Sequence, residues 1–233
     1  MKHTQHQSTQ QLPYGLLLTA NSGTLTSFTY LYCDGTFAGF QSGNMVKLAV
    51  NIGAGHWSKL IPLLVSVFSF MLGVFVVRYL QYRGIRHYNL LRRHRYVLCL
   101  MLLILLIVRF GYDLLPTIVV NGLLSMCAAS EFEEFRLLQG GGFSHLMMTG
   151  NLRTLSESIF DYYKNPVSNE HNGAVRTMKR MGALIGGYLI GAMAVSVGSH
   201  WFHSHVIGLS FFMTLTLLLL TFRMPPEPIV EEG

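Results

Sequence analysis

The stretch FQSGNMVKL, from Phe40 to Leu48, returns later in the chain as MMTGNLRTL, from Met147 to Leu155. Each copy places Gly-Asn directly before a short helix-like run, and the surrounding sequence is apolar enough for a bilayer. In hydrocarbon, an interrupted helix is tolerated only where its freed amide and carbonyl groups find protein, water or a ligand. The repeated break therefore predicts a shared internal site.

The composition indicates a polytopic membrane protein. Of the 233 residues, 51% are hydrophobic and 12% are charged, which is too little charge for an ordinary soluble domain. The net charge of +6 comes with basic blocks beside apolar runs, so it indicates membrane topology rather than nucleic-acid binding. The three cysteines are widely spaced and form no CxxC pair, so we expect no disulfide framework, metal site or cofactor.

Aligning the two Gly-Asn pairs shows that the chain is a duplicated unit. Asn44 matches Asn151 at a shift of 107 residues, and Gly73 matches Gly191 at a shift of 118, so an insertion of 11 residues lengthens the second copy. The first shift also superposes Phe28 on Phe135, Leu31 on Leu138, Gly35 on Gly142 and Leu48 on Leu155. We expect a single membrane domain, 1–233, with repeat 1 at about 13–111, repeat 2 at about 114–223, a polar N-terminal tail (1–12) and an acidic C-terminal tail (224–233).

Positive charge predicts how the two copies are oriented. The segment 78–95 holds six arginines and no acidic residue, and such segments favour the cytoplasmic side. The loop that ends near Lys179 is also basic. If both basic segments lie on the cytoplasmic side, the three apolar runs between them must bring the chain back to that side. Three full crossings cannot do this, but two crossings and one re-entrant element can. The run 36–52 is likewise too short to cross about 30 Å of hydrocarbon.

These arguments predict an all-α integral membrane protein built from two inverted repeats. It would have about six transmembrane helices and two re-entrant or discontinuous short helices, with both termini cytoplasmic, in the cytoplasmic (plasma) membrane. Inverted repeats with paired helix breaks are typical of secondary transporters. Within the second copy, glycines four residues apart predict a close approach of another helix; these are Gly182, Gly186, Gly187 and Gly191.

The residues at the two breaks are the candidate substrate-binding residues. Glycine lets a ligand approach backbone amides, and Ser, Thr and Asn accept hydrogen bonds at a helix start. The candidates are Ser42, Gly43, Asn44, Thr149, Gly150 and Asn151, together with Asn21 in the polar first helix. Plain capping of two short helices is the alternative. Lys47 and Arg153 could add positive charge to the breaks or extend to lipid headgroups.

Glu131 is the candidate coupling residue. Together with Glu133 and Glu134 it lies inside a predicted span, where a carboxylate is costly unless it is paired, hydrated or protonated. The alternatives are a structural ion pair with Arg136, or a position at the membrane interface if this helix ends early. His200, His203 and His205 lack the paired ligands of a metal site, and no catalytic motif is present in the sequence, so we do not expect an enzyme.

The two copies, TFAGFQSGNMVKLAV and FSHLMMTGNLRTLSESI, resemble the paired TGN motifs of the YoaK-like family of bacterial membrane proteins of unknown function. The resemblance covers nearly the whole chain and implies the compartment and architecture rather than an activity. This chain has Ser42 where the family motif has Thr, and Thr26 and Glu131 stand where the family has other polar residues.

The sequence thus predicts a small secondary transporter or permease for a small anion or polar solute, bound between the Gly-Asn breaks. The expected partners are the lipid bilayer, that solute, and anionic lipid headgroups at the basic segment 78–95. Homo-oligomer formation is left open. The alternative is a non-transporting membrane scaffold that interacts with lipids or a protein partner.

Overall fold

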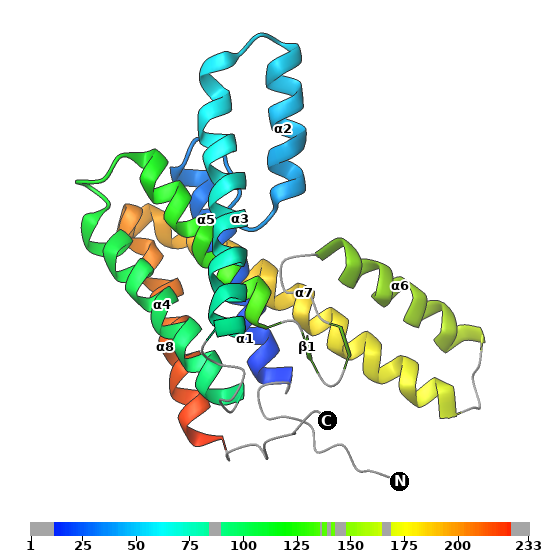
Figure 1. Ribbon diagram of the computed structural model, residues 1–233. Coiled ribbons are helices and arrows are strands. Elements are labelled where there is room, and N and C mark those ends of the chain that lie inside the picture. The colour runs from blue at the N-terminus through cyan, green and yellow to red at the C-terminus, as the bar shows by residue number, and fades with distance from the viewer. Residues whose placement is uncertain are drawn as a thin grey trace.

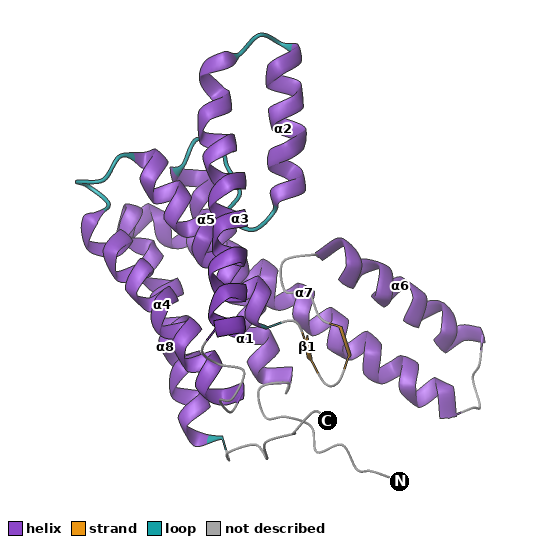
Figure 2. Ribbon diagram, in the orientation of Figure 1, coloured by secondary structure: helices purple, strands orange, loops and turns teal. Residues whose placement is uncertain are grey.

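The computed structural model describes residues 12–83, 90–135, 137–138, 141–142, 148–164 and 169–224. Almost all of this described chain is helical, as Figure 2 shows. The α-helices are α1 (Leu12–Tyr32), α2 (Gln41–Gly53), α3 (Leu60–Arg83), α4 (Leu90–Gly111), α5 (Thr117–Glu134), α6 (Met148–Lys164), α7 (Asn169–Phe202) and α8 (Gly208–Arg223). The predicted all-α class is confirmed.

Short elements join or interrupt these helices. The 3₁₀ turns η2 (Trp57–Lys59) and η3 (His203–Ile207) lead directly into α3 and α8. Between α5 and α6, β1 (Leu137–Leu138) pairs antiparallel with β2 (Gly141–Gly142). The helix that carries the second Gly-Asn pair, α6, begins at Met148, after this ribbon in the chain.

Within the described residues, three segments are long and apolar enough to cross a membrane. They are Trp57–Tyr82, Leu90–Gly111 and His171–Arg223. A spanning helix needs about 20 apolar residues, and the third segment, with 53 residues, contains α7, η3 and α8. These helices are typical of a membrane protein. The predicted number of spans and their orientation stay predictions.

The first helix of each half of the chain packs mainly on a long helix of the other half. In the first half α1 packs mainly on α7, and in the second half α5 packs mainly on α3. Each short helix lies against the helix that follows it, α2 on α3 and α6 on α7, and the two hairpins extend away from the rest of the bundle in Figure 1. The pair α4 and α8 lies side by side.

Glycine allows the two main helix crossings to be close. A Cβ on Gly191 of α7 would lie 2.0 Å from the carbonyl oxygen of Ala20 in α1. A Cβ on Gly73 of α3 would lie 2.7 Å from the carbonyl oxygen of Met126 in α5. The two glycines matched in sequence therefore occupy corresponding crossings. Of the glycines expected in a helix contact, Gly187 and Gly191 meet α1, whereas Gly182 and Gly186 face open space.

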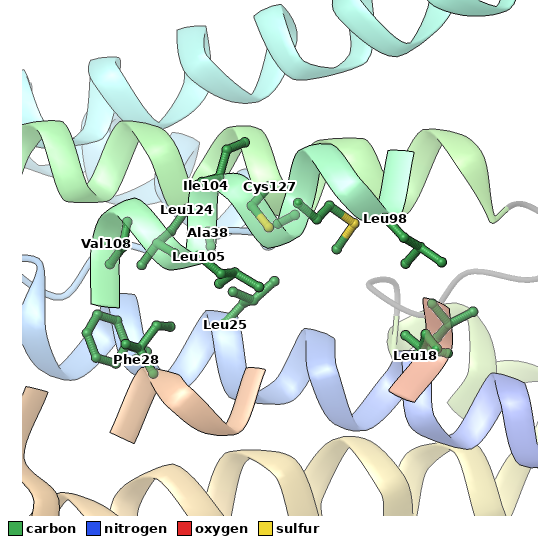
Figure 3. Close-up of a cluster of buried hydrophobic side chains, with 14 of the residues drawn as sticks. Leu18, Leu25, Phe28, Ala38, Leu98, Ile104, Leu105, Val108, Leu124 and Cys127 are labelled. Atoms are coloured by element: carbon green, nitrogen blue, oxygen red, sulfur yellow. The ribbon is translucent and has the colours of Figure 1, made fainter. Parts of the chain in front are cut away.

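A continuous apolar core lies among α1, α4 and α5. Figure 3 shows Leu25 and Phe28 of α1 opposite Leu105 and Val108 of α4, with Leu124 of α5 close by. Close packing of these side chains stabilises the contact between the helices through dispersion attraction. Buried polar side chains lie at two places in the bundle, one around Asn44 and one around Glu131. Both of these residues were predicted from the sequence to belong to the site.

Candidate functional site

The first Gly-Asn break is held together by the side chain of Asn44. This residue is fully buried. Its Oδ1 accepts a hydrogen bond from the backbone amide of Phe37 (2.9 Å), and its Nδ2 lies 2.8 Å from the Phe37 carbonyl oxygen. The same Nδ2 contacts Gln41 Oε1 at 2.9 Å and Ser66 Oγ at 3.0 Å. Asn44 therefore fixes the turn-containing segment that precedes α2.

Further polar contacts tie this segment to α3 and α5. Ser66 Oγ of α3 lies 2.8 Å from Ser125 Oγ of α5. Thr36 Oγ1 donates to Asn121 Oδ1 (2.8 Å), and Asn121 Nδ2 donates to the carbonyl oxygen of Pro62 (2.8 Å). Because buried polar groups cost free energy unless they are paired, this network defines one position for the start of α2.

The second break is more open. Thr149 and Gly150 are exposed, and Asn151 is 6% exposed with its Nδ2 at 3.8 Å from Met148 Sδ. The residue before α6 is Met147, which lies outside the described residues. A Cβ added at Gly150 would meet no atom of the described residues within 4 Å, so those residues leave room for a larger side chain at the start of α6.

The two breaks meet at one cavity of about 560 Å³. Its lining comes from the start of α2, the start of α6, and parts of α3, α5 and α7: Gly39, Phe40, Gln41, Ser42, Phe70, Phe132, Met148, Thr149, Gly150 and Tyr188. Three predicted binding residues, Ser42, Thr149 and Gly150, thus share one cavity. Gly43, Asn44 and Asn151 lie next to it but are not among the lining residues.

Seven lining residues were not among the sequence candidates. Gly39, Phe40 and Met148 lie in or beside the two motif stretches, and the others are Gln41, Phe70, Phe132 and Tyr188. Gln41 directly precedes Ser42, so its position was within reach of the motif argument. Tyr188 follows Gly187 in a glycine-rich helix, and a polar-tipped aromatic there was an available signal. Phe70 and Phe132 carried no signal, because they are indistinguishable in sequence from core or lipid-facing residues.

Asn21 and Glu131 form a second polar site, away from the cavity lining. Glu131 is 1% exposed. Asn21 Nδ2 of α1 donates to Glu131 Oε2 (2.9 Å), and Ser22 Oγ lies 3.3 Å from Glu131 Oε1. Ser210 Oγ of α8 donates to Asn21 Oδ1 (2.6 Å). The carboxyl group of Glu131 on α5 is therefore linked to α1 and α8 deep in the bundle.

The two other acids of α5 bind basic residues at the end of the helix. Glu134 Oε1 lies 2.7 Å from Arg93 Nε and 2.6 Å from His94 Nδ1 of α4, and Glu133 Oε1 lies 2.9 Å from Arg78 Nε of α3. Arg136, the partner expected from the sequence, lies outside the described residues. A structural ion-pair role fits Glu133 and Glu134, whereas Glu131 has amide and hydroxyl neighbours.

The remaining charged candidates do not line the cavity. Lys47 Nζ donates to the carbonyl oxygen of Gly35 and lies 4.4 Å from the ring centroid of Phe37. Arg153 Nε pairs with Glu157 Oε1 (2.8 Å) on the exposed face of α6. Among the described residues there is no group of three or more His, Cys, Asp or Glu side chains suited to a metal ion.

Comparison with known protein families gives one match, which covers nearly the whole chain. The model of DUF1275, described as a protein of unknown function, matches residues 14–220. The chain belongs to the DUF1275 family. This DUF1275 match spans both predicted repeats and is compatible with the resemblance to YoaK-like proteins. No curated protein and no solved structure matches the chain.

Proposed function

We propose that this DUF1275 protein is a small membrane permease that binds a small polar solute or anion between the first turns of α2 and α6. The observation that carries the proposal is the shared cavity, because residues 107 positions apart in the two motifs, Ser42 and Thr149, line the same space. A volume of about 560 Å³ is within the range of small-molecule sites.

The chemistry of the lining favours a solute with both polar and apolar surface. Phe40, Phe70 and Phe132 provide apolar walls, and Ser42 and Thr149 provide hydroxyl groups where the helices begin. Helix N-termini favour partial negative charge. No Lys or Arg is among the described residues that line the cavity, so the proposed anion would be bound by hydroxyl and amide groups rather than by an ion pair.

The proposed architecture is the inverted repeat predicted from the sequence, with about six spans and two short helices. The exchange of helix partners supports the duplication. In the proposed repeat, α1 corresponds to α5, α2 to α6, α3 to α7 and α4 to α8. The contact of α1 with α7 then corresponds to that of α5 with α3, and the contact of α2 with α3 to that of α6 with α7. The proposed topology has cytoplasmic termini, with the segment 78–95 next to anionic lipid headgroups.

In this proposal Asn44 is a positioning residue and Glu131 is the coupling residue. Asn44 holds the cavity wall in place, because both polar atoms of its side chain contact protein groups. Glu131 is suited to coupling because its carboxyl group is buried and accepts a hydrogen bond from Asn21 of α1, which in turn accepts one from Ser210 of α8. A movement of these helices on solute binding would alter both hydrogen bonds.

Solute flux into proteoliposomes tests the permease. Formate, phosphate, glycerol and glycine are suitable probes, with protein-free liposomes as the baseline. Gly150→Trp should fill the cavity and lower the flux of the transported probe at least tenfold, and the fold should tolerate it because a Cβ at Gly150 meets no atom of the described residues within 4 Å. Gly173→Trp is the matched control, since a Cβ there also meets none of the described residues and Gly173 is not among the described residues that line the cavity.

A non-transporting scaffold is the second candidate, favoured by the complete pairing of Asn44 inside the protein. Equal flux in the Gly150→Trp and Gly173→Trp proteins would remove the cavity assignment. Flux no higher than in protein-free liposomes for every probe would favour the scaffold. The inverted arrangement is tested separately by single cysteines at His56 and Asn169, and labelling of both from the same side would contradict it.

A further inference from the structure

A second cavity, of about 510 Å³, lies within the α2–α3 hairpin and differs from the first in its charge. Its polar lining comes from the turn after α1, the second half of α2, and η2: Asp34, Lys47, Asn51, Ser58 and Lys59. Pro62 and Leu63 of α3 also line it. The described linings of the two cavities have no residue in common. Two lysines against one aspartate give this second cavity a net positive lining, which favours an anionic group.

The contacts of Lys47 hold its ammonium group in place at this cavity. Lys47 Nζ donates to the Gly35 carbonyl oxygen. It also lies 5.0 Å from the ring centroid of Tyr30 and 4.4 Å from that of Phe37. Asp34 and Gly35 both have positive φ (54° and 69°), so the chain turns sharply after α1 where this carbonyl oxygen meets α2. A lysine ammonium group has three N–H donors, so donation to Gly35 leaves two for a ligand.

The second lysine and two neutral polar side chains add donors from other parts of the lining. Lys59 and Ser58 are neighbours in η2, and both are exposed. Asn51 lies one turn after Lys47 on the same face of α2, and its Nδ2 donates to the Lys47 carbonyl oxygen (2.8 Å). Neither lysine forms an ion pair with a carboxylate of the described residues. Because the two ammonium groups repel one another, an anion bound at both would be stabilised.

Exposed apolar side chains flank this cavity on the hairpin. Val50, Trp57 and Ile61 each adjoin a lining residue in sequence and are 64%, 67% and 57% exposed. The hairpin extends away from the rest of the bundle (Figure 1). Tryptophan and lysine side chains are typical of the membrane interface. The basic segment 78–95 begins at the other end of α3, which has 24 residues and is therefore about 36 Å long, so the two positive regions are separate.

We propose that the α2–α3 cavity binds a phosphate group, and the apolar side chains around it favour the headgroup of an anionic phospholipid as the source. Lys47 and Lys59 bind the phosphate oxygens through charge-assisted hydrogen bonds. Asn51, Ser58 and Asp34 bind hydroxyl groups of a headgroup such as phosphatidylglycerol, and the acyl chains lie against the exposed apolar side chains. Free inorganic phosphate offers the same oxygens without acyl chains. This binding requires no solute transport, so it does not depend on the proposed permease.

Quenching of Trp57 fluorescence by brominated phospholipids tests the site in the full-length protein in detergent micelles. The chain has two tryptophans, so Trp201→Phe leaves Trp57, beside Ser58, as the single reporter. Brominated phosphatidylglycerol should quench it at a roughly fivefold lower concentration than brominated phosphatidylcholine, because lysine attracts an anionic headgroup. Lys59→Gln should remove most of this difference, and the fold should tolerate it because the side chain is exposed. Lys164→Gln removes the same charge from the exposed end of α6 and should leave the difference unchanged.

Thermal unfolding in inorganic phosphate distinguishes the two sources of the phosphate group. A melting temperature that rises in phosphate relative to sodium chloride at equal ionic strength, and does not rise in Lys59→Gln, would assign the cavity to free phosphate. Equal quenching by the two lipids together with no such rise would overturn the proposal, and so would a lipid preference that Lys59→Gln leaves intact. Gly150→Trp should keep the lipid preference even where it blocks solute flux, so this proposal and the permease proposal can fail separately.

Discussion

The two Gly-Asn breaks carry the same motif in different surroundings. At the first break Asn44 is fully buried and contacts Phe37, Gln41 and Ser66. At the second break Asn151 is 6% exposed, and a Cβ added at Gly150 would have no neighbouring atom within 4 Å among the described residues, whereas a Cβ at Gly43 would meet the Phe40 ring. Ser42 and Thr149 are both exposed and both asparagines are buried, so the two copies of the motif differ in the space around the glycine.

The largest expected contrast comes from removing the two asparagine side chains. Asn44→Ala leaves the backbone amide of Phe37 without its partner, whereas the Phe37 carbonyl oxygen still accepts from Ser66 Oγ and Gln41 Nε2. The change should lower the free energy of unfolding by about 2 kcal/mol, since an unpaired buried group costs about 1–3 kcal/mol. Asn151→Ala makes the same change at the second break, where the side chain is also buried. Thermal unfolding of both variants in the same detergent gives the comparison. Equal losses of stability would show that the two breaks are equally fixed.

A second contrast uses the glycines of the same motifs. A Cβ on Gly43 would lie 2.4 Å from the ring of Phe40, whereas a Cβ on Gly150 meets nothing within 4 Å in the described part of the chain. Gly43→Ala should therefore cost about 1–2 kcal/mol through overpacking. Gly150→Ala should be neutral or stabilising by up to about 1 kcal/mol, because alanine is the better helix former. A stable Gly43→Ala protein would mean that the Phe40 ring moves aside easily.

The smallest contrast concerns the two basic residues that follow the breaks. Lys47 donates to the Gly35 carbonyl oxygen and lies over the rings of Tyr30 and Phe37, whereas Arg153 is exposed and forms a weak surface pair with Glu157 on the same helix. Lys47→Met should lower the melting temperature measurably, and Arg153→Met should not. A larger effect of Arg153→Met would indicate that α6 has a contact in the membrane or with a second copy.

Sequence reasoning located the breaks but not the partners of their side chains. It placed Ser42 and Thr149 near one another, and the structure brings both to one cavity. It treated Asn44 as a ligand-binding residue, whereas its amide group contacts Phe37 and Ser66. The reason is that an asparagine at a helix start has the same local sequence signal whether it binds a ligand or the neighbouring backbone.

The role of Asn21 was predicted only in part. A polar residue in an apolar helix indicated an interior position, and Asn21 is buried. Its hydrogen bond to Glu131 joins residues 110 positions apart, so no local pattern could identify the pair.

The sequence by itself determined that this chain is helical and apolar and that it carries the Gly-Asn motif twice, because hydropathy, charge blocks and motifs can be read along the chain. Only the tertiary structure decided that α1 packs on α7 and α5 on α3, that both breaks reach one cavity, and that Glu131 contacts Asn21. These features depend on which helices cross and how closely. Gly73 and Gly191 permit that approach, but the partner at each crossing is set by the packing of the whole bundle.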